Sequence, residues 1–263
     1  MYDFSQISRA ASPAPIRVNA ETRAGLLAEI ARRLAAGEGF SLATLNVDHL
    51  VKIARDPAFR AAYAAHDLVT ADGNPIVWLC RLAGQKGVEL VPGSEIVEPV
   101  AELAAKAGVG VALLGSTEAS LAAAAAALQA RHRGLQIVAQ IAPPMGFDPD
   151  GPGADDAIAA LAGSGAGLCY LALGAPKQER FAARAQTRLP EMGFLSIGAG
   201  LDFVAGTQVR APVLVRRLAL EWLWRLGRNP RRLAARYAAC FAILPRAAAT
   251  ARRARLTTEG AAR

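Results

Sequence analysis

Short apolar runs alternate along this chain with longer alanine-rich stretches. That alternation is typical of parallel β-strands joined by covering helices. The sequence therefore predicts an α/β fold, a Rossmann-like parallel sheet with helices on both faces. The strands are expected at residues 40–45, 67–71, 109–114, 135–141, 168–173 and 193–197. The helices are expected near residues 20–36, 47–64, 75–83, 94–107, 117–131, 154–162 and 176–189.

Positive charge is concentrated at the C-terminal end. Residues 204–263 hold 13 arginines and two acids, a net charge of +11, which leaves −3 for the remainder of a chain of net charge +8. Such asymmetry favours a basic module for an anionic partner: a lipid surface, a nucleic acid or a diphosphate. We therefore expect a loose lead-in at 1–18, a Rossmann-like catalytic domain at 19–205 and an Arg-rich helical appendage at 206–263. A chain ending before Gly206 is expected to keep its α/β body folded.

Cysteine usage and the N-terminus favour a cytoplasmic protein. The three cysteines lie in apolar runs without C-x-x-C spacing, which disfavours disulfides or a zinc site. The first residues lack the apolar segment of a secretory signal, and no apolar run reaches the roughly 18 residues of a membrane span. His49, His66 and His132 have no metal-ligand spacing, so we expect no metal site and read them as surface or hydrogen-bonded residues.

One strand is expected to end on an acid. Residues 69–75 read VTADGNP, so Asp72 follows a buried run, Gly73 permits a tight turn and Pro75 suits the first turn of a helix. In open parallel sheets, ligands bind outside the carboxyl ends of the strands. Asp72 is therefore a candidate general base, although its position equally suits a helix cap.

Other strand ends carry polar residues and glycines that predict a cleft along the same edge. Asn46 suits either a ligand contact or a helix N-cap, and Gly115 with Ser116 forms a candidate anion-binding turn. Glu179 and Asp202 are further candidate bases, ranked after Asp72. The expected substrate-binding residues are Thr44, Asn46, Gly73, Asn74, Gly115, Ser116, Gly174, Lys177, Gln178, Glu179 and Asp202.

Several enzyme classes lack their signatures here. There is no full G-x-G-x-x-G fingerprint, no Walker A lysine loop and no G-x-S-x-G elbow. A nucleic-acid-binding module would explain the arginines, but they are interleaved with Leu and Trp and show no recognisable reader fold. A transferase with a carboxylate base fits best. The alternatives are a Rossmann-like nucleotide-sugar-modifying enzyme and an anion-binding module without activity.

Seven segments, taken together, carry a more specific resemblance. They read TLNVDHLVKIARDPAFRAAYAAHDLVTADGNPIVW, VPGSE, VALLGS, GFDP, LALGAPKQE, GAGLDFVAGT and RAPVLVRRLALEWLWRL. Over roughly residues 19–237 the chain resembles the WecG/TagA/CpsF family of bacterial glycosyltransferases. The combination of ADG, GAPKQE and RAP…LEW is the most specific part.

The resemblance implies an inverting, metal-independent and cofactor-free transfer of a sugar from a UDP-sugar to a polyprenyl-diphosphate-linked saccharide. It implies that Asp72 is the base, that Thr44 and Asn46 lie beside the sugar, and that Gln178 lies near the nucleotide. N-acetylmannosamine, its uronic acid and glucose all fit the family as the transferred sugar. Leu90 departs from the pattern, because the family often has an arginine there, and this departure bears on donor binding.

The resemblance also implies an appendage that contacts the inner face of the cell membrane and brings arginines to the active site. Residues 213–226 mix Leu, Val and Trp with arginines, which is typical of a helix lying on an anionic membrane. Alternatively, the apolar residues pack on the sheet domain and the arginines are solvated. The candidates for contact with the acceptor or leaving diphosphate are Arg210, Arg216, Arg217 and Arg225.

Overall fold

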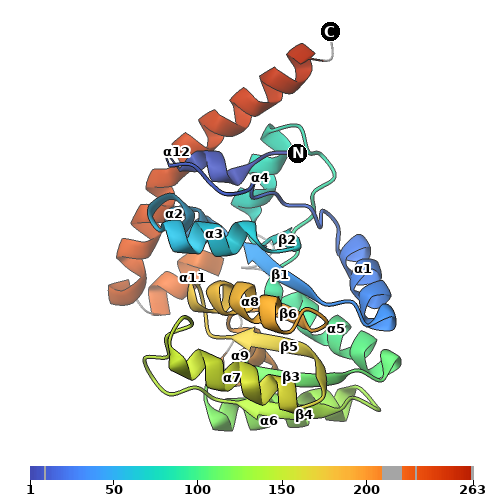
Figure 1. Cartoon of the computed structure of the whole chain (residues 1–263). Helices are drawn as coiled ribbons and strands as arrows, with labels where there is room; N and C mark the ends of the chain where they lie inside the picture. The colour runs from blue at the N-terminus through green and yellow to red at the C-terminus, as the bar shows by residue number, and fades with distance from the viewer. Residues whose placement is uncertain (9, 209–220, 229, 262–263) are drawn as a thin grey trace.

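The computed structural model describes residues 1–8, 10–208, 221–228 and 230–261 (Figure 1). Its centre is a sheet of six strands, all parallel, in the order β2-β1-β6-β5-β3-β4. This sheet, with helices around it, confirms the predicted Rossmann-like α/β fold. The strands are β1 (Phe40–Leu45), β2 (Leu68–Ala71), β3 (Gly110–Gly115), β4 (Ile137–Ile141), β5 (Ala166–Ala172) and β6 (Gly193–Ser196).

Successive strand side chains enter opposite cores. Leu113 and Leu195 belong to one core cluster, whereas Leu114 and Phe194 belong to another on the opposite face. One face is covered by α1 (Arg23–Ala36), α5 (Gly93–Ala107), α6 (Glu118–Arg131) and α9 (Gly200–Val204). The other carries α2 (Val47–Arg55), α3 (Pro57–Ala64), α4 (Asn74–Leu82), α7 (Pro152–Gly163), α8 (Lys177–Arg188) and α12 (Pro230–Ala261). Both faces of the sheet are therefore covered, as near-continuous apolar strands require, except at the edge strand β4, where Val138 stays exposed.

One predicted helix, residues 47–64, is in fact two. Asp56 ends α2, and its carboxylate accepts hydrogen bonds from the backbone N–H groups of Ala58 and Phe59. Pro57 then opens α3, where its missing N–H costs nothing. The apolar spacing continues across this break, which is why the pattern alone predicted one helix.

A loose lead-in was expected at residues 1–18, but the described residues of this segment pack against the core. They include a short 3-10 helix, η1 (Phe4–Ile7), and bury five large apolar side chains against α2 and α12. The phenol of Tyr2 donates to the backbone oxygen of Ala247 at 3.3 Å and to Thr250 Oγ1 at 2.9 Å. The buried side chains are Tyr2, Phe4, Ile7, Ile16 and Val18.

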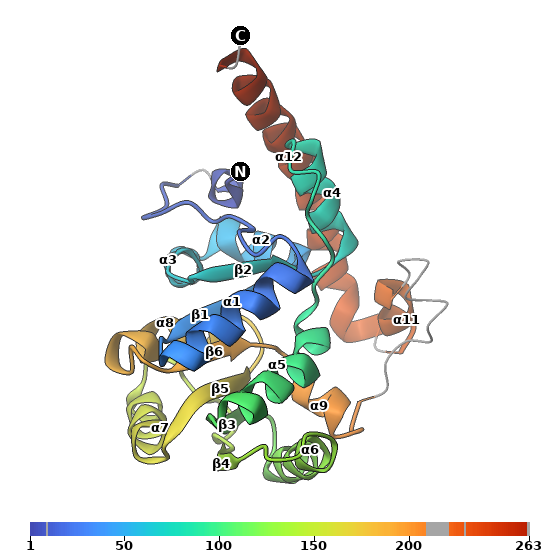
Figure 2. The ribbon, with the colours of Figure 1, turned by 90° about the vertical axis from the view of Figure 1, so that its right-hand side faces the viewer.

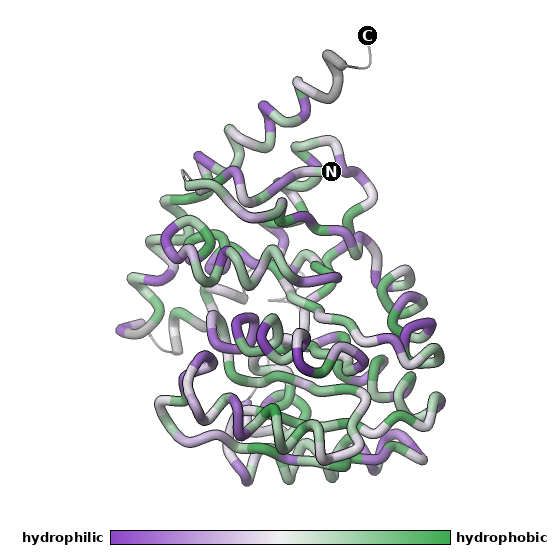
Figure 3. Tube along the Cα trace, in the orientation of Figure 1, coloured by the Kyte–Doolittle hydropathy of each residue, from purple (hydrophilic) through white to green (hydrophobic). Residues whose placement is uncertain are grey.

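Within the expected appendage, the described residues 221–228 and 230–261 are helical, as expected, but one side of α12 belongs to the core. Ala247 and Ala251 of α12 are fully buried in the cluster that also contains Tyr2 and Leu50. Figure 3 shows hydrophobic and hydrophilic positions alternating along α12. Among the described residues, no helix combines the length and hydropathy needed to span a bilayer.

Candidate active site

The predicted base lies at the edge where all six strands end. Leu45 of β1 pairs with Ala71 of β2, and the backbone N–H of Asp72 donates to the oxygen of Leu45 at 2.8 Å. Asn46 and Asp72 therefore leave adjacent strands side by side. Because the strands are parallel, the turns after β5 and β6 end on this same edge.

Gly73 makes the turn that separates Asp72 from α4. Its φ is +117°, a conformation that an L-residue side chain disfavours. Gly73, not Asp72, is the N-cap residue of α4, with Asn74 and Pro75 in the first turn. The half-buried Asp72 thus lies two residues before α4, at the carboxyl edge of the sheet.

Asn46 performs the capping role that the sequence left open. Its Oδ1 accepts from the backbone N–H of His49 at 3.1 Å, and its Nδ2 lies 3.3 Å from His49 Nε2. Thr44 is buried beside Gly93, at the start of α5. A Cβ on Gly93 would lie 3.3 Å from Thr44 Oγ1 and 3.2 Å from the Cα of Ile197, so glycine there allows α5 to approach β1 and β6 closely.

Two buried polar side chains, His49 and Tyr63, lie behind Asn46 and Asp72. His49 Nδ1 is 3.3 Å from the Tyr63 hydroxyl. Burial lowers the pKa of His49 to about 3, so its imidazole is neutral at physiological pH. Burial also raises the pKa of Tyr63 well above its usual value, and the carboxylates of Glu179 and then Asp72 add to that rise. Tyr63 therefore lies within electrostatic reach of both acids.

Gln178 joins the turns after β5 and β6. Its Oε1 accepts from the backbone N–H of Gly174 at 3.2 Å and of Gly198 at 3.0 Å. Its Nε2 donates to Glu179 Oε1 at 2.9 Å. The amide is thus engaged within the protein and fixes the backbone of both turns, while Lys177 opens α8 beside it.

Glu179 is a fully buried acid directly after Gln178. Its Oε2 has no hydrogen-bond partner among the described residues. Burial raises its pKa to about 7, against the opposing effect of the Gln178 hydrogen bond. A carboxyl group that titrates near neutrality is typical of functional sites, although buried structural groups show the same shift.

Asp202 belongs to a different cluster, at the end of β3. Its Oδ1 accepts from Ser116 Oγ at 2.6 Å and Ser120 Oγ at 2.7 Å, and its Oδ2 accepts from Gln208 Nε2 at 3.0 Å. Since β3 is four strands from β2, this cluster lies about 19 Å across the sheet from Asp72. Asp202 ties α9 to the turn after β3, and the structure does not bring it together with Asp72.

The turn at Gly115 and Ser116 is nonetheless unusual. Gly115 has a φ of +116°, and a Cβ there would lie 2.5 Å from the backbone oxygen of Ala172. Ser116 has a φ of +50° although it is not glycine. Only this pair of conformations lets the chain turn so close to β5, so the turn is tightly specified.

The structure adds an ion-pair cluster that the sequence did not single out. The Asp48 carboxylate, in the first turn of α2, pairs with Lys52 and lies 3.1 Å from Arg236 Nε of α12. Burial alone would raise the pKa of Asp48, but Lys52 and Arg236 outweigh it and the pKa is lowered. The four-residue spacing of Asp48 and Lys52 was a usable signal. Nothing in the sequence pointed to Arg236.

Several predicted residues fall elsewhere. Arg210, Arg216 and Arg217 lie outside the described residues, with most of the expected membrane segment 213–226, and Arg225 lies in α11 (Glu221–Arg228). Leu90 is exposed between α4 and α5. The described ranges contain no cluster of three His, Cys, Asp or Glu side chains suited to a metal.

Taken together, the fold and this edge define a Rossmann-like α/β protein with polar residues at the carboxyl ends of its strands. Residues 12–259 match the Glycosyl transferase WecG/TagA/CpsF family. The chain belongs to that family, and it is therefore a glycosyltransferase of cell-surface polysaccharide biosynthesis.

Proposed function

We propose that this enzyme is an inverting, metal-independent glycosyltransferase that uses a UDP-sugar and a polyprenyl-diphosphate-linked saccharide. The observation that carries the proposal is the position of Asp72, next to Asn46 at the carboxyl edge of the sheet, in a chain of a glycosyltransferase family. Ligands of open parallel sheets bind at this edge.

In the proposed reaction, an acceptor hydroxyl attacks the anomeric carbon of the donor sugar. The hydroxyl proton passes to the Asp72 carboxylate as the new glycosidic bond forms and the bond to the UDP oxygen breaks. A single displacement of this kind inverts the anomeric configuration. Thr44, Asn46, Gly73 and Asn74 then surround the sugar, because they lie on the strand ends beside Asp72.

The nucleotide half of the donor is assigned to the neighbouring turns. Gly174, Lys177, Gln178 and Glu179 follow β5, and their backbone is held by the Gln178 amide. The turn of Gly115 and Ser116, with Asp202 behind it, is a second part of the same edge. Arg210, Arg216, Arg217 and Arg225 are proposed to offset the diphosphate charge, and the location is proposed to be the inner face of the cell membrane.

Replacing Asp72 with Asn tests the base directly. D72N keeps the shape of the side chain and removes its basicity, so we expect turnover to fall roughly 10²- to 10⁴-fold with unchanged thermal stability. The matched control is D56N, because Asp56 caps α3 away from the edge and should leave turnover unchanged. Near-normal turnover by D72N would reject Asp72 as the base.

A donor panel tests the rest of the proposal. Each UDP-sugar is assayed with a short-chain prenyl-diphosphate disaccharide, and transfer is scored by the mass of the elongated acceptor and its anomeric configuration. We expect one UDP-sugar to be preferred, a product of inverted configuration and full activity in EDTA. Retention of configuration, or loss of activity in EDTA, contradicts the mechanism even if a sugar is transferred.

A further inference from the structure

The first turn of α8 contains a buried acid to which the proposed reaction gives no step. Glu179 is fully buried, and α8 packs against α3, β6 and β1 on one face of the sheet (Figure 2). Its Oε1 accepts a hydrogen bond from Gln178 Nε2 at 2.9 Å, whereas its Oε2 has no hydrogen-bond partner among the described residues. Glutamate is rarely buried so completely, and its presence here requires an explanation.

The partner of Glu179 is an amide group that works in one orientation only. Gln178 Oε1 accepts from the backbone N–H groups of Gly174 and Gly198, so both of its lone pairs are used. A rotation of the amide by about 180° would turn its NH₂ group toward these two donors and break both hydrogen bonds. The hydrogen bond from Gln178 Nε2 to Glu179 stabilises the observed orientation, because the rotated amide would lose it.

The two turns that this amide holds lie in the middle of the carboxyl edge. In the strand order, the turns after β6 and β5 separate Asp72, which follows β2, from Ser116, which follows β3. Gly174 and Gly198 have φ values of +72° and +56°, so each turn has a conformation that favours glycine. Because β6 is two strands from β2, about 10 Å across the sheet, a nucleotide-sugar with its sugar beside Asp72 extends over these turns.

We infer that Glu179 is a positioning residue for the donor: its buried carboxyl group fixes the Gln178 amide, and the amide fixes the two turns on which the nucleotide half of the donor lies. The inference rests on the proposed function, and it gives Glu179 an indirect role through Gln178 in place of a contact with the substrate. Burial suits this role, because a carboxylate exposed on these turns would repel the diphosphate of the donor.

The same carboxyl group makes the two turns sensitive to pH. Burial raises the pKa of Glu179 to about 7; the Gln178 hydrogen bond and then Lys52 oppose this rise, and Asp48 adds to it. Above pH 7 the buried carboxylate lies beside the turns and repels a diphosphate, so donor affinity should fall as the pH rises. The charged and titratable groups on the surrounding elements are Asp48, His49 and Lys52 of α2, Arg60 and Tyr63 of α3, Asp72 after β2, Cys169 of β5 and Asp155 of α7, besides Lys177 and Arg180 of α8 itself.

Hydrogen exchange of the Gly174 and Gly198 amides tests the inference without any substrate. E179M keeps a side chain of similar size but offers Gln178 no acceptor, so both amides should exchange about tenfold faster or more. E179Q keeps an acceptor and should match the parent. The control E191M makes the same change at an exposed acid just beyond the other end of α8, and the amides of β3 report any global loss of stability. Unchanged exchange of both glycine amides in E179M overturns the inference.

Calorimetric titration with UDP measures the consequence for the donor. At pH 6 the dissociation constant should rise about tenfold or more in E179M and stay within about twofold of the parent in E179Q. Between pH 6 and pH 8 the parent should lose about tenfold in affinity relative to E179Q, because its Glu179 passes from mostly neutral to mostly ionised. The ionisation of UDP itself is common to both proteins and cancels. An equal pH dependence of parent and E179Q overturns the role given to the charge of Glu179.

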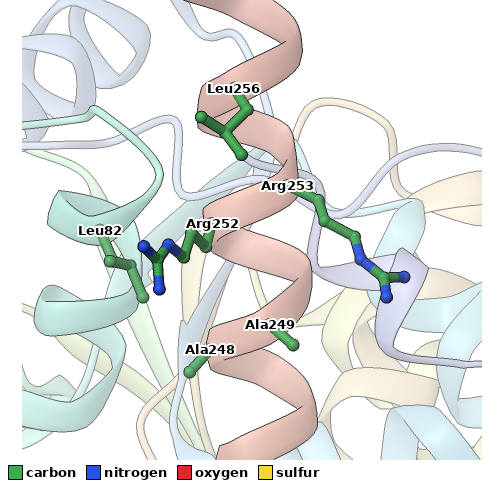
Figure 4. A pocket seen from close by; sticks show the side chains of 6 residues that line it. All are labelled: Leu82, Ala248, Ala249, Arg252, Arg253 and Leu256. Atoms are coloured by element: carbon green, nitrogen blue, oxygen red, sulfur yellow. The ribbon is translucent and has the colours of Figure 1, made fainter.

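A second control excludes binding of UDP to other cations. Arg252 and Arg253 line an open groove between α4 and α12, away from the carboxyl edge (Figure 4). R252Q/R253Q removes two positive charges from this groove and should leave the affinity for UDP unchanged. A loss of affinity in R252Q/R253Q as large as that in E179M would place UDP in the groove and overturn the inference.

The transfer assay separates this inference from the proposed reaction. E179M should raise the KM for the UDP-sugar more than it lowers kcat, because the acceptor hydroxyl and the base are unchanged. If the parent transfers sugar and E179M matches it in hydrogen exchange and donor KM, the reaction stands and the inference is wrong. If E179M loosens the turns and weakens UDP binding while the parent transfers no sugar, the reaction is wrong and the positioning role stands. If the parent binds no UDP, the proposed donor is wrong, and faster exchange in E179M keeps Glu179 as the residue that holds the turns.

Discussion

The Glu179 carboxyl group couples the candidate site to pH. Its pKa is raised from 4.5 to about 7 by burial, so the folded protein keeps this proton over a range where the unfolded chain has lost it. Between those two values the folded state binds more protons than the unfolded state. The contribution of Glu179 to stability therefore falls as pH rises from about 4.5 to about 7.

E179Q should remove this dependence. Gln keeps the volume and polarity but carries no charge, so its unfolding free energy relative to the parent should increase by on the order of 3 kcal/mol between pH 5 and pH 8. Urea unfolding at both pH values measures the change. His49 and His66, whose pKa values burial lowers to about 3 and about 4, destabilise both proteins in acid and cancel in the comparison. A difference between E179Q and parent that is equal at both pH values would show that Glu179 is ionised throughout.

At this scale the sequence located strand-end residues better than it assigned their contacts. Asp72, Asn46 and Gln178 follow buried strands, and the turn residues around them allow their position at a strand end to be predicted. The burial of Glu179 could not be predicted, because the sequence KQER is typical of the polar first turn of an exposed helix. The distance of Asp202 from Asp72 depends on strand order, which pairs β2 with β1 and not with β3.

Among the elements, strands were predicted to within two residues because both faces of the sheet are covered and each strand is a bounded apolar run. The N-terminal segment was missed for the opposite reason. Its five buried side chains follow no period, and part of their partner surface lies on α12, far along the chain. The hydrophobic periodicity of a sequence predicts only the contacts that a regular helix or strand makes at repeated intervals.

Truncation before α12 should destabilise the protein. This is the reverse of the expectation from the sequence, that a chain ending before Gly206 keeps its α/β body folded. A chain ending at Ala205 uncovers Tyr2 and Leu50 and removes the buried Ala247 and Ala251, so it should lose several kcal/mol of stability or aggregate. A chain ending at Arg255 keeps those contacts and is the matched control. Thermal unfolding of both measures the effect. An Ala205-terminated chain as stable as the parent would mean that α12 is an independent appendage.

On the scale of the whole molecule, the two ends of the described chain share one core cluster. Removing residues 1–8 should therefore loosen α12, because Tyr2 and its hydrogen bonds to Ala247 and Thr250 are lost. Hydrogen exchange of the amides of residues 246–252 should accelerate by about tenfold or more, as expected for a loss above 1.4 kcal/mol. Exchange in α7, which packs in a different cluster, is the internal control. Unchanged protection of α12 would show that α2 and α4 alone hold it.

The contact between Tyr2 and Ala247 joins residues that are 245 positions apart, so it has consequences for synthesis on the ribosome. Domains fold as units while the N-terminal part emerges first. Here the first residues must wait for nearly the last ones before their core closes. Until then α2 and α4 have no α12 beside them. The core that joins the two ends of the chain is therefore complete only on molecules whose translation has passed α12.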